Sequence, residues 1–190
     1  DLNKYKKHRI IPYENSYIII LTFKNQIKRE KLESEVEELG FSKDRFIMGI
    51  SSNHEKLGEL NISIKESKYA YKYSVIYNKN VTYFSNIGTN KILMPLIENP
   101  WIQSYYNDLI MPIVNYDRKN NTELLATAVN YIENNRNIKA TALDMAQHSN
   151  TIRYRIDKIN NILKNSCGIN NFDEEVSLAV RIHKLMKNNL

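Results

Sequence analysis

The chain has 190 residues and a formal net charge of +6, so it is long enough for one or two modest domains. This charge is too mild for a protein that coats DNA along its length. A single cysteine, Cys167, excludes an internal disulfide and predicts a reducing, cytoplasmic setting, with the thiol an ordinary loop residue rather than a redox sensor. No apolar run reaches the length of a membrane span, so we expect no membrane segment.

The first part of the chain predicts a hairpin followed by a helix. Runs rich in β-branched and aromatic residues at 9–13 and 17–23 flank residues 14–16, Glu-Asn-Ser, which are a turn signal. Residues 26–39 then carry aliphatic side chains at helical spacing with acidic residues between them. Gly40 follows this run and predicts where the helix stops.

A strand, a second helix and a second hairpin are expected next. Residues 45–50 are predicted to form a core strand, and residues 54–73 are predicted to be mostly helical. Residues 75–77 and 81–84 have the composition of strands, and the turn signal Asn-Lys-Asn at 78–80 lies between them. This order of elements predicts an antiparallel or mixed sheet with helices packed on it.

An aromatic stripe marks the middle of the chain. Apolar residues at 92–97 predict a short helix that stops before Pro100. The aromatic and aliphatic side chains from Trp101 to Ile110 follow at helical spacing, and we expect this helix to end near Pro112. Such a stripe is interpreted as core, and a dimer surface is the alternative, since tryptophan and tyrosine favour interfaces.

The boundary between two domains is predicted from composition. The run from Tyr116 to Asn121 is polar and charged, which is typical of linkers between domains. We therefore place an α/β domain with trailing helices at residues 1–116, a linker at 117–121 and a second domain at 122–190.

The most informative stretch of the second domain is residues 137–163, which read NIKATALDMAQHSNTIRYRIDKINNIL. The small or apolar side chains of Ala140, Ala142 and Met145 predict a short helix that lies against a neighbour. Residues 146–148 interrupt this pattern, so we expect a tight turn there. A second helical pattern begins directly after the turn.

This second helix is predicted to begin at Ser149, whose hydroxyl is placed to act as its N-cap. Four aliphatic side chains then recur at helical spacing and form one buried stripe: Ile152, Ile156, Ile159 and Leu163. Two short helices joined by a tight turn, the second of them basic, predict a helix-turn-helix that reads DNA. The alternative is an amphipathic helix with a solvated basic face.

The residue types on the basic face suit the major groove of DNA. An arginine can bond a guanine edge at two points, an asparagine can do the same for adenine, and threonine and lysine commonly hold phosphates. Base contacts are therefore assigned to Ser149, Asn150 and Arg153. The rest of the predicted DNA-binding set, mainly phosphate contacts, consists of Lys139, Thr141, Thr151, Tyr154, Arg155 and Lys158.

Three short runs in this domain carry a resemblance to a known family. Residues 140–142, Ala-Thr-Ala, and residues 150–155, Asn-Thr-Ile-Arg-Tyr-Arg, resemble the C-terminal helix-turn-helix of PucR/CdaR-type bacterial regulators in order and spacing. Residues 122–125, Thr-Glu-Leu-Leu, are similar to the start of that family's entry helix. The resemblance implies an all-α, Fis-like DNA-binding fold. Ser149 and Lys139 depart from residues common in the family and leave the base preference open.

The first domain resembles, in its order of elements, the GGDEF-like domain that precedes this helix-turn-helix in the same family. In an active diguanylate cyclase the first hairpin turn carries glycines that admit phosphate and carboxylates that hold metal. Here the turn at residues 13–17 has no glycine and one carboxylate, that of Glu14. The resemblance therefore implies a degenerate domain without cyclase activity, used for dimerisation or signal transmission.

These features predict an α+β fold class, with a degenerate GGDEF-like sheet-and-helix domain followed by an all-α helix-turn-helix domain. The resemblance implies a transcriptional regulator of a metabolic operon that binds double-stranded operator DNA as a homodimer or higher oligomer. Because residue 1 is Asp rather than Met, we expect a piece of a longer protein, with a small-molecule effector bound upstream.

No enzyme activity, cofactor or metal site is expected. The four histidines have no metal-ligand spacing with one another or with the cysteine, and no phosphate loop or nucleophile elbow is present. Two alternatives to a DNA reader remain. One is an enzyme, a divergent nucleotide cyclase or hydrolase, and the other is a protein-interaction module whose helix-turn-helix no longer binds DNA.

Overall fold

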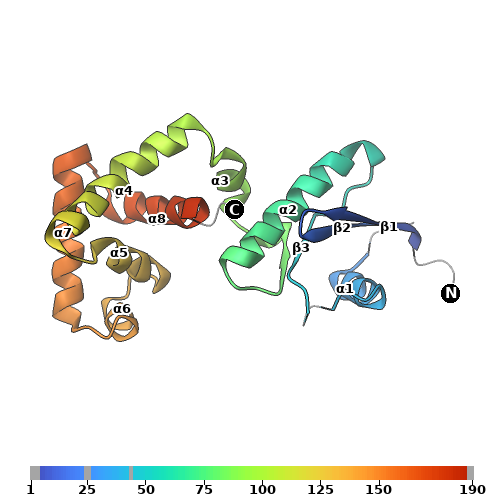
Figure 1. Cartoon of the computed structure of the whole chain (residues 1–190), viewed down its shortest axis with the longest axis horizontal. Helices are drawn as coiled ribbons and strands as arrows, with labels where there is room; N and C mark the ends of the chain where they lie inside the picture. The colour runs from blue at the N-terminus through green and yellow to red at the C-terminus, as the bar shows by residue number, and fades with distance from the viewer. Residues whose placement is uncertain (1–4, 24–26, 43–44, 188–190) are drawn as a thin grey trace. The chain divides into compact units, whose positions relative to one another are not determined.

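The structure is a computed structural model that describes residues 5–23, 27–42 and 45–187, in two compact units (Figure 1). Unit 1 comprises residues 1–91 and unit 2 comprises residues 92–190. Unit 1 combines two small sheets with helices, whereas the described part of unit 2 has only helices as regular structure. None of the described helices is both long and apolar enough to cross a membrane.

Unit 1 opens with the predicted hairpin. Strand β1, Tyr5–Tyr13, pairs antiparallel with strand β2, Ser16–Phe23, and Tyr13 lies opposite Ser16. The turn between them places Glu14 at a φ of +50°, and the Ser16 hydroxyl donates a hydrogen bond to the Tyr13 carbonyl at 2.8 Å. The prediction of a hairpin around residues 14–16 is confirmed.

The second sheet consists of strand β3, Met48–Ile50, and strand β4, Val81–Tyr83, which pair in parallel. Between them the chain forms a short 3₁₀ helix, Leu57–Glu59, and helix α2, Leu60–Ile76. Parallel strands need such a crossover connection. The predicted second hairpin is therefore wrong, because residues 75–77 form the last turn and cap of α2, and β4 pairs with β3 instead.

Gly49 explains how α2 and the second sheet come so close. A Cβ atom at this position would fall 2.0 Å from the backbone nitrogen of Tyr71 and 2.2 Å from the carbonyl oxygen of Ser67. The Ser74 hydroxyl adds a hydrogen bond to the Met48 carbonyl at 3.1 Å. These contacts lie in the part of α2 that precedes Val75 and Ile76, and these two β-branched residues continue the helix despite their strand propensity.

Helix α1, Arg29–Glu38, ends at Gly40, whose φ of +89° suits a residue without a side chain. The predicted glycine stop is confirmed, and the first residue of the predicted helix lies outside the described residues. Tyr83 fastens α1 to the second sheet, because its hydroxyl donates to the Glu33 carboxylate at 2.6 Å and the Arg29 guanidinium lies over its ring. Burial, and then the bond to Glu33, raise the pKa of the Tyr83 hydroxyl above its ordinary value.

A short 3₁₀ helix, Phe84–Asn86, leads to helix α3, Asn90–Leu96, which spans the division between the two units. Helix α4, Pro100–Asn120, follows with proline in its first turn. Asn99 is its N-cap, and the Asn99 side chain accepts a first-turn backbone N–H at 2.9 Å. The predicted helix stop before Pro100 is confirmed.

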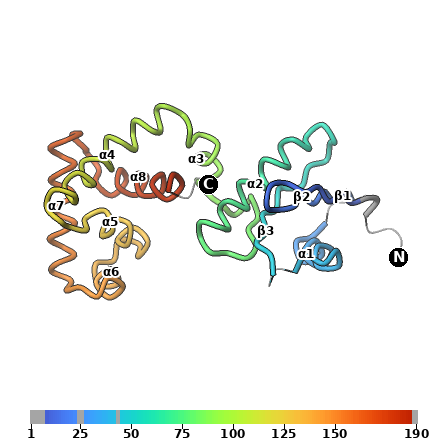
Figure 2. Tube along the Cα trace, viewed as in Figure 1, coloured from blue at the N-terminus to red at the C-terminus, as the bar shows by residue number. Residues whose placement is uncertain are grey.

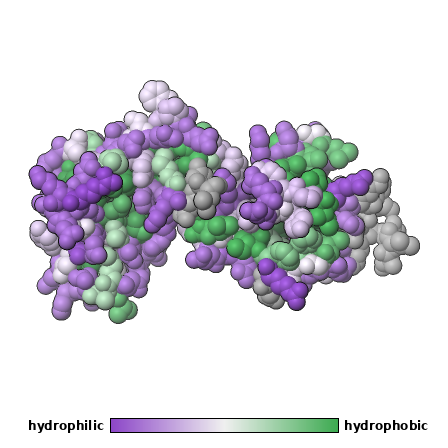
Figure 3. All heavy atoms as spheres, viewed as in Figure 1, coloured by the Kyte–Doolittle hydropathy of each residue, from purple (hydrophilic) through white to green (hydrophobic). Residues whose placement is uncertain are grey.

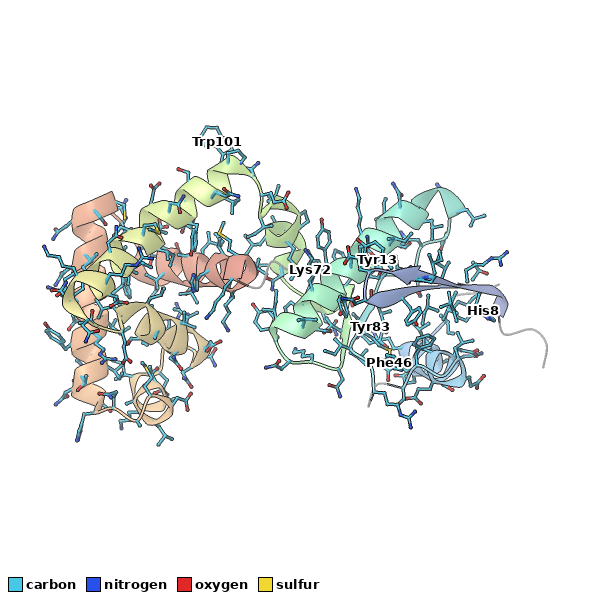
Figure 4. The ribbon with its side chains drawn as sticks, viewed as in Figure 1. His8, Tyr13, Phe46, Lys72, Tyr83 and Trp101 are labelled. Atoms are coloured by element: carbon cyan, nitrogen blue, oxygen red, sulfur yellow. The ribbon has the colours of Figure 1, made fainter. Side chains whose placement is uncertain are left out.

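Helix α4 differs from its prediction in two respects. It continues beyond Pro112, because Leu109, Ile110 and Ile113 are buried on either side of the proline and hold the helix against the rest of unit 2. Trp101, which was expected in the core, is 82% exposed and projects from the start of the helix (Figure 4). Periodicity therefore identified the helix but not the full extent of its buried face.

Unit 2 is completed by four helices: α5, Leu124–Glu133, α6, Ile138–Asp144, α7, Ser149–Cys167, and α8, Phe172–Lys187 (Figure 2). Helix α4 packs against α5, α7 and α8. One core joins the five helices, and its buried members are Leu109, Ile110, Ile113, Leu124, Ala128, Ala142, Ile152, Ile156, Ile159, Leu163, Val176, Ala179 and Val180.

The division into units differs from the boundaries expected from composition. The compact units divide between residues 91 and 92, and most of the expected linker at 117–121 forms the last turn of α4. The placement of domains at 1–116 and 122–190 stays a prediction. Within unit 2, however, the buried residues of α4 belong to the same core as those of α5 to α8.

Candidate nucleic-acid interface

The candidate site is built on helices α6 and α7 and the turn that joins them. Asn137 starts α6, since its side-chain oxygen accepts the backbone N–H groups of Lys139 and Ala140 at 3.0 and 3.1 Å. This cap was not predicted from the sequence, although an asparagine directly before a helical pattern is a recognisable signal. The cap fixes the first turn of α6, on which exposed Lys139 lies.

The turn after α6 holds a residue in the left-handed region. The Ala146 N–H bonds to the Leu143 carbonyl at 3.1 Å, and the Gln147 N–H bonds to the Ala142 carbonyl at 2.9 Å. This is the hydrogen-bond pattern of a Schellman motif, in which glycine is usual at the left-handed position. Here that position is Ala146, with a φ of +49°. The predicted break at residues 146–148 is confirmed.

Helix α7 begins with His148 as its N-cap, and the His148 carbonyl accepts the N–H groups of Thr151 and Ile152 at 2.9 and 3.2 Å. The prediction that Ser149 caps this helix is wrong. Ser149 is already the first helical residue, and the N-cap makes no side-chain hydrogen bond. The Ser149 hydroxyl therefore does not cap the start of α7.

The inner face of α7 is the predicted aliphatic stripe. Ile152, Ile159 and Leu163 are fully buried, and Ile156 is nearly so. Helix α7 packs against α4, α5 and α6, and α6 lies beside its N-terminal end (Figure 1). The prediction of this stripe is confirmed, and it determines which side of α7 remains available to a ligand.

Asn150, Arg153 and Tyr154 lie outside the buried stripe of α7. Successive residues of a helix are rotated by about 100°, which places Asn150 and Tyr154 opposite the stripe and Arg153 at roughly a right angle to it. All three are exposed, Tyr154 to 66%. Within the described part of the chain, none of these side chains makes a hydrogen bond or an ion pair. They are the predicted site residues that the structure brings together on one open surface.

Arg155 and Lys158 turn toward neighbouring helices. The Arg155 Nη1 donates to Glu123 Oε2 at 3.3 Å and to Thr127 Oγ1 at 3.2 Å, and its side chain is only 18% exposed. The Lys158 Nζ lies 5.0 Å from the ring centroid of Tyr116 on α4, a cation–π contact. Their phosphate contacts stay predictions, but both side chains already have partners within unit 2.

The hydroxyl residues of the predicted set are less accessible. Thr141 is fully buried, and its hydroxyl donates to the Asn137 carbonyl at 2.8 Å. Ser149 and Thr151 are half-buried in the first turn of α7. The structure therefore places Thr141 in the core of unit 2, away from the surface formed by the exposed residues of α7.

Asp117 is a further residue that the sequence analysis missed. Its carboxylate accepts the backbone N–H groups of Leu124 and Leu125 at 2.8 and 2.9 Å and the Thr122 hydroxyl at 2.6 Å. The end of α4 thus caps the start of α5. This geometry gives roles to two side chains of the Thr-Glu-Leu-Leu run, because Thr122 bonds to the cap while Glu123 bonds to α7. The two leucines contribute only backbone N–H groups to the cap.

Helix α8 is fastened to α4 by two tyrosines. The Tyr105 hydroxyl donates to Glu175 Oε2 at 2.5 Å, and the Tyr106 hydroxyl lies 2.9 Å from His183 Nδ1. Burial, and then the bond to Glu175, raise the pKa of Tyr105, and burial lowers the pKa of His183. These bonds stabilise the packing of α8 against α4, and α4 in turn packs against α7. The described residues contain no group of three or more potential metal ligands.

Comparison with known families identifies the domain that carries these helices. Residues 124–183 match the family model described as the PucR C-terminal helix-turn-helix domain, which covers less than a third of the chain. Comparisons with curated proteins and with solved structures found no match. The resemblance of unit 1 to a GGDEF-like domain stays a prediction. Residues 124–183 are thus a PucR-type C-terminal helix-turn-helix domain, the DNA-binding part of a family that regulates transcription.

Proposed function

We propose that this protein is a sequence-specific DNA-binding regulator of transcription that reads its operator with helix α7. The observation that supports this most directly is the exposed row of Asn150, Arg153 and Tyr154 on α7. The aliphatic stripe of the same helix is buried in the core of unit 2. An arginine without an intramolecular partner keeps its full fork of donors for a ligand. The row lies in the first turns of the second helix of a helix-turn-helix, the part that enters the major groove.

The chemistry of the row suits base edges and phosphates. In this proposal Arg153 bonds a guanine at two points and Asn150 bonds an adenine, with half-buried Ser149 completing the base-reading group. Tyr154 and Lys139, both exposed, are assigned to the phosphate backbone, which sets the register of the helix on the duplex.

A second part of the proposal concerns assembly and regulation. An operator with two half-sites needs two reader helices at a fixed spacing, so we propose a homodimer or higher oligomer. Unit 1 is proposed to be a degenerate GGDEF-like domain that dimerises or transmits a signal without cyclase activity, and Glu14 and Asn15 in its hairpin turn support this. The regulated genes are proposed to form a metabolic operon, with a small-molecule effector bound upstream of this sequence.

A fluorescence titration of the full chain against the promoter DNA of its own gene and a scrambled duplex, each at two salt concentrations, tests the proposal. We expect preference for the promoter and weaker binding as salt rises, because phosphate contacts release counterions. Equal, salt-sensitive binding to both duplexes would show phosphate attraction alone. Absence of binding to either would favour a protein-interaction module.

Substitution of the proposed base contact tests the same idea at residue level. Arg153→Ala is expected to weaken promoter binding by about tenfold to a hundredfold, the loss typical of a bidentate base contact. Lys164→Ala is the matched control, because Lys164 is an exposed cation at the other end of the same helix. Equal affinities of the two variants would contradict the assignment of α7 as the reader.

A further inference from the structure

Arg155 and Arg153 lie two residues apart on α7 but have different surroundings. Arg153 is exposed and has no partner among the described residues, whereas the Arg155 side chain is 18% exposed and bonds to α5. Among the described residues, Arg155 is the one α7 side chain that hydrogen-bonds a neighbouring helix. Its partner Glu123 is the N-cap residue of α5. The bond therefore joins α7 to the start of α5.

Thr127 completes this cluster. Its side chain is fully buried, and its hydroxyl donates to the Glu123 carbonyl at 2.7 Å. Because the hydroxyl proton is used there, the oxygen is left to accept the Arg155 Nη1 at 3.2 Å. Arg155 thus has one charged and one neutral acceptor, both at the start of α5.

The first turn of α5 is itself held by α4, through the Asp117 carboxylate. The aliphatic stripe of α7 determines which side of the helix faces the core, but hydrophobic contact is not directional and leaves small rotations of the helix less restricted than hydrogen bonds do. Hydrogen bonds have preferred distances and angles, so the bonds of Arg155 restrict the rotation of α7 about its own axis.

We infer that Arg155 is a positioning residue for DNA reading and not a DNA contact. Through Glu123 and Thr127 it sets the rotation of α7 that aims Arg153 and Asn150 away from the core. This inference rests on the proposed DNA-binding function and gives different roles to the two arginines of one short run. One of them binds the ligand, and the other orients the helix that carries it.

The direction in which one substitution changes DNA affinity separates positioning from direct contact. In the full chain, Glu123→Gln is expected to weaken binding to the promoter duplex by about threefold to tenfold, the range of a lost coupling between neighbouring residues. If Arg155 contacted phosphate, the same substitution would tighten binding. It would release the arginine and remove a negative charge close to a polyanion.

Two further variants complete the design. Thr127→Val removes the neutral acceptor with little change in volume and no change in charge, and it is expected to weaken binding in the same way. Glu174→Gln removes an exposed carboxylate from the start of α8 and is expected to leave affinity unchanged. Circular dichroism melting of each variant fixes a titration temperature at which all of them are folded, so that a loss of stability alone does not change the measured affinity.

Each outcome decides the question. Weaker promoter binding by both folded variants, Glu123→Gln and Thr127→Val, supports the inference. Unchanged or tighter binding by either of these two folded variants overturns it, even if Arg153→Ala still loses affinity. If the parent chain binds no DNA, or if Arg153→Ala binds as tightly as the parent, the proposed function fails and the inference fails with it.

Discussion

Units 1 and 2 differ in how completely they bury their apolar side chains. In unit 2 five helices share one core, and Ile152 and Ile159 of α7 have no exposed surface. In unit 1 neither β2 nor β3 has a fully buried residue, and Tyr17 and Ile47 are 56% and 47% exposed. Figure 3 shows hydrophobic residues, in green, on the visible face of this unit. Unit 2 is therefore stabilised by a shared core, and unit 1 depends more on individual close contacts.

The largest expected effect tests the core of unit 2. Ile159→Ala removes a fully buried side chain from the middle of α7 and is expected to lower the free energy of unfolding by about 4 kcal/mol, through lost transfer energy and a residual cavity. In unit 1, Ile11 is 44% exposed, and Ile11→Ala is expected to cost about 1 kcal/mol or less. Urea unfolding followed by circular dichroism gives both values, and equal losses would remove the contrast between the units.

A close contact in unit 1 gives the next largest effect. Gly49→Ala would place a methyl group 2.0 Å from the backbone nitrogen of Tyr71, so strand and helix must separate. We expect a loss of about 3 kcal/mol, at the upper end for overpacking, because the obstacle is backbone and not a movable side chain.

The matched control for this substitution is in the same unit. A Cβ at Gly58 meets nothing within 4 Å, so Gly58→Ala is expected to change the free energy of unfolding by about 0.5 kcal/mol or less. Similar unfolding midpoints for the two variants would show that β3 does not pack on α2 through Gly49.

The same contrast explains which parts of the fold could be predicted from sequence. The helix-turn-helix is encoded locally, because Ile152, Ile156, Ile159 and Leu163 recur at the period of one helix and a short break precedes them. Both the break and the buried stripe were predicted correctly. The identity of the residues packed against each face depends on tertiary neighbours, which is why Trp101 was expected in the core and is exposed.

Unit 1 was harder to predict because its pairing is non-local. Residues 75–77, Val-Ile-Tyr, have strand propensity, but they form the end of α2, whose preceding turns lie against β3 at Gly49. Within the site, the residue type indicated that Arg153 and Arg155 are both suited to phosphate or base contacts. Only the geometry shows that Glu123, far away in sequence, already bonds to one of them.

A smaller effect tests whether α4 belongs to unit 2, although it lies outside the matched residues 124–183. Asp117→Ala removes the acceptor of two backbone N–H groups at the start of α5 and is expected to cost about 1.5 kcal/mol, as for other lost caps. Asp108→Ala, at an exposed position of the same helix, is the control and is expected to change stability by about 0.5 kcal/mol or less. A neutral Asp117→Ala would mean that α5 begins without help from α4.

The smallest expected effect is a gain, in the turn between α6 and α7. Ala146 has a φ of +49°, a conformation that costs a residue with a Cβ about 1–2 kcal/mol and costs glycine nothing. Glycine also makes the unfolded chain more flexible, which offsets roughly half of this gain. Ala146→Gly is therefore expected to raise the free energy of unfolding by about 0.5 kcal/mol.

Ala140 provides the opposite control within the same short helix. Its backbone is helical, so Ala140→Gly has no strain to relieve and is expected to lower stability by about 1 kcal/mol. Stability changes of opposite sign for the two substitutions in one urea experiment would establish that Ala146 carries a strain that helical Ala140 lacks. If Ala146→Gly instead lowered stability, the left-handed turn that sets the angle between α6 and α7 would not be present in solution.

Because Gly keeps the Schellman hydrogen bonds, the promoter affinity of Ala146→Gly is expected to stay within about twofold of the parent. Stability and DNA reading would then change independently at this turn.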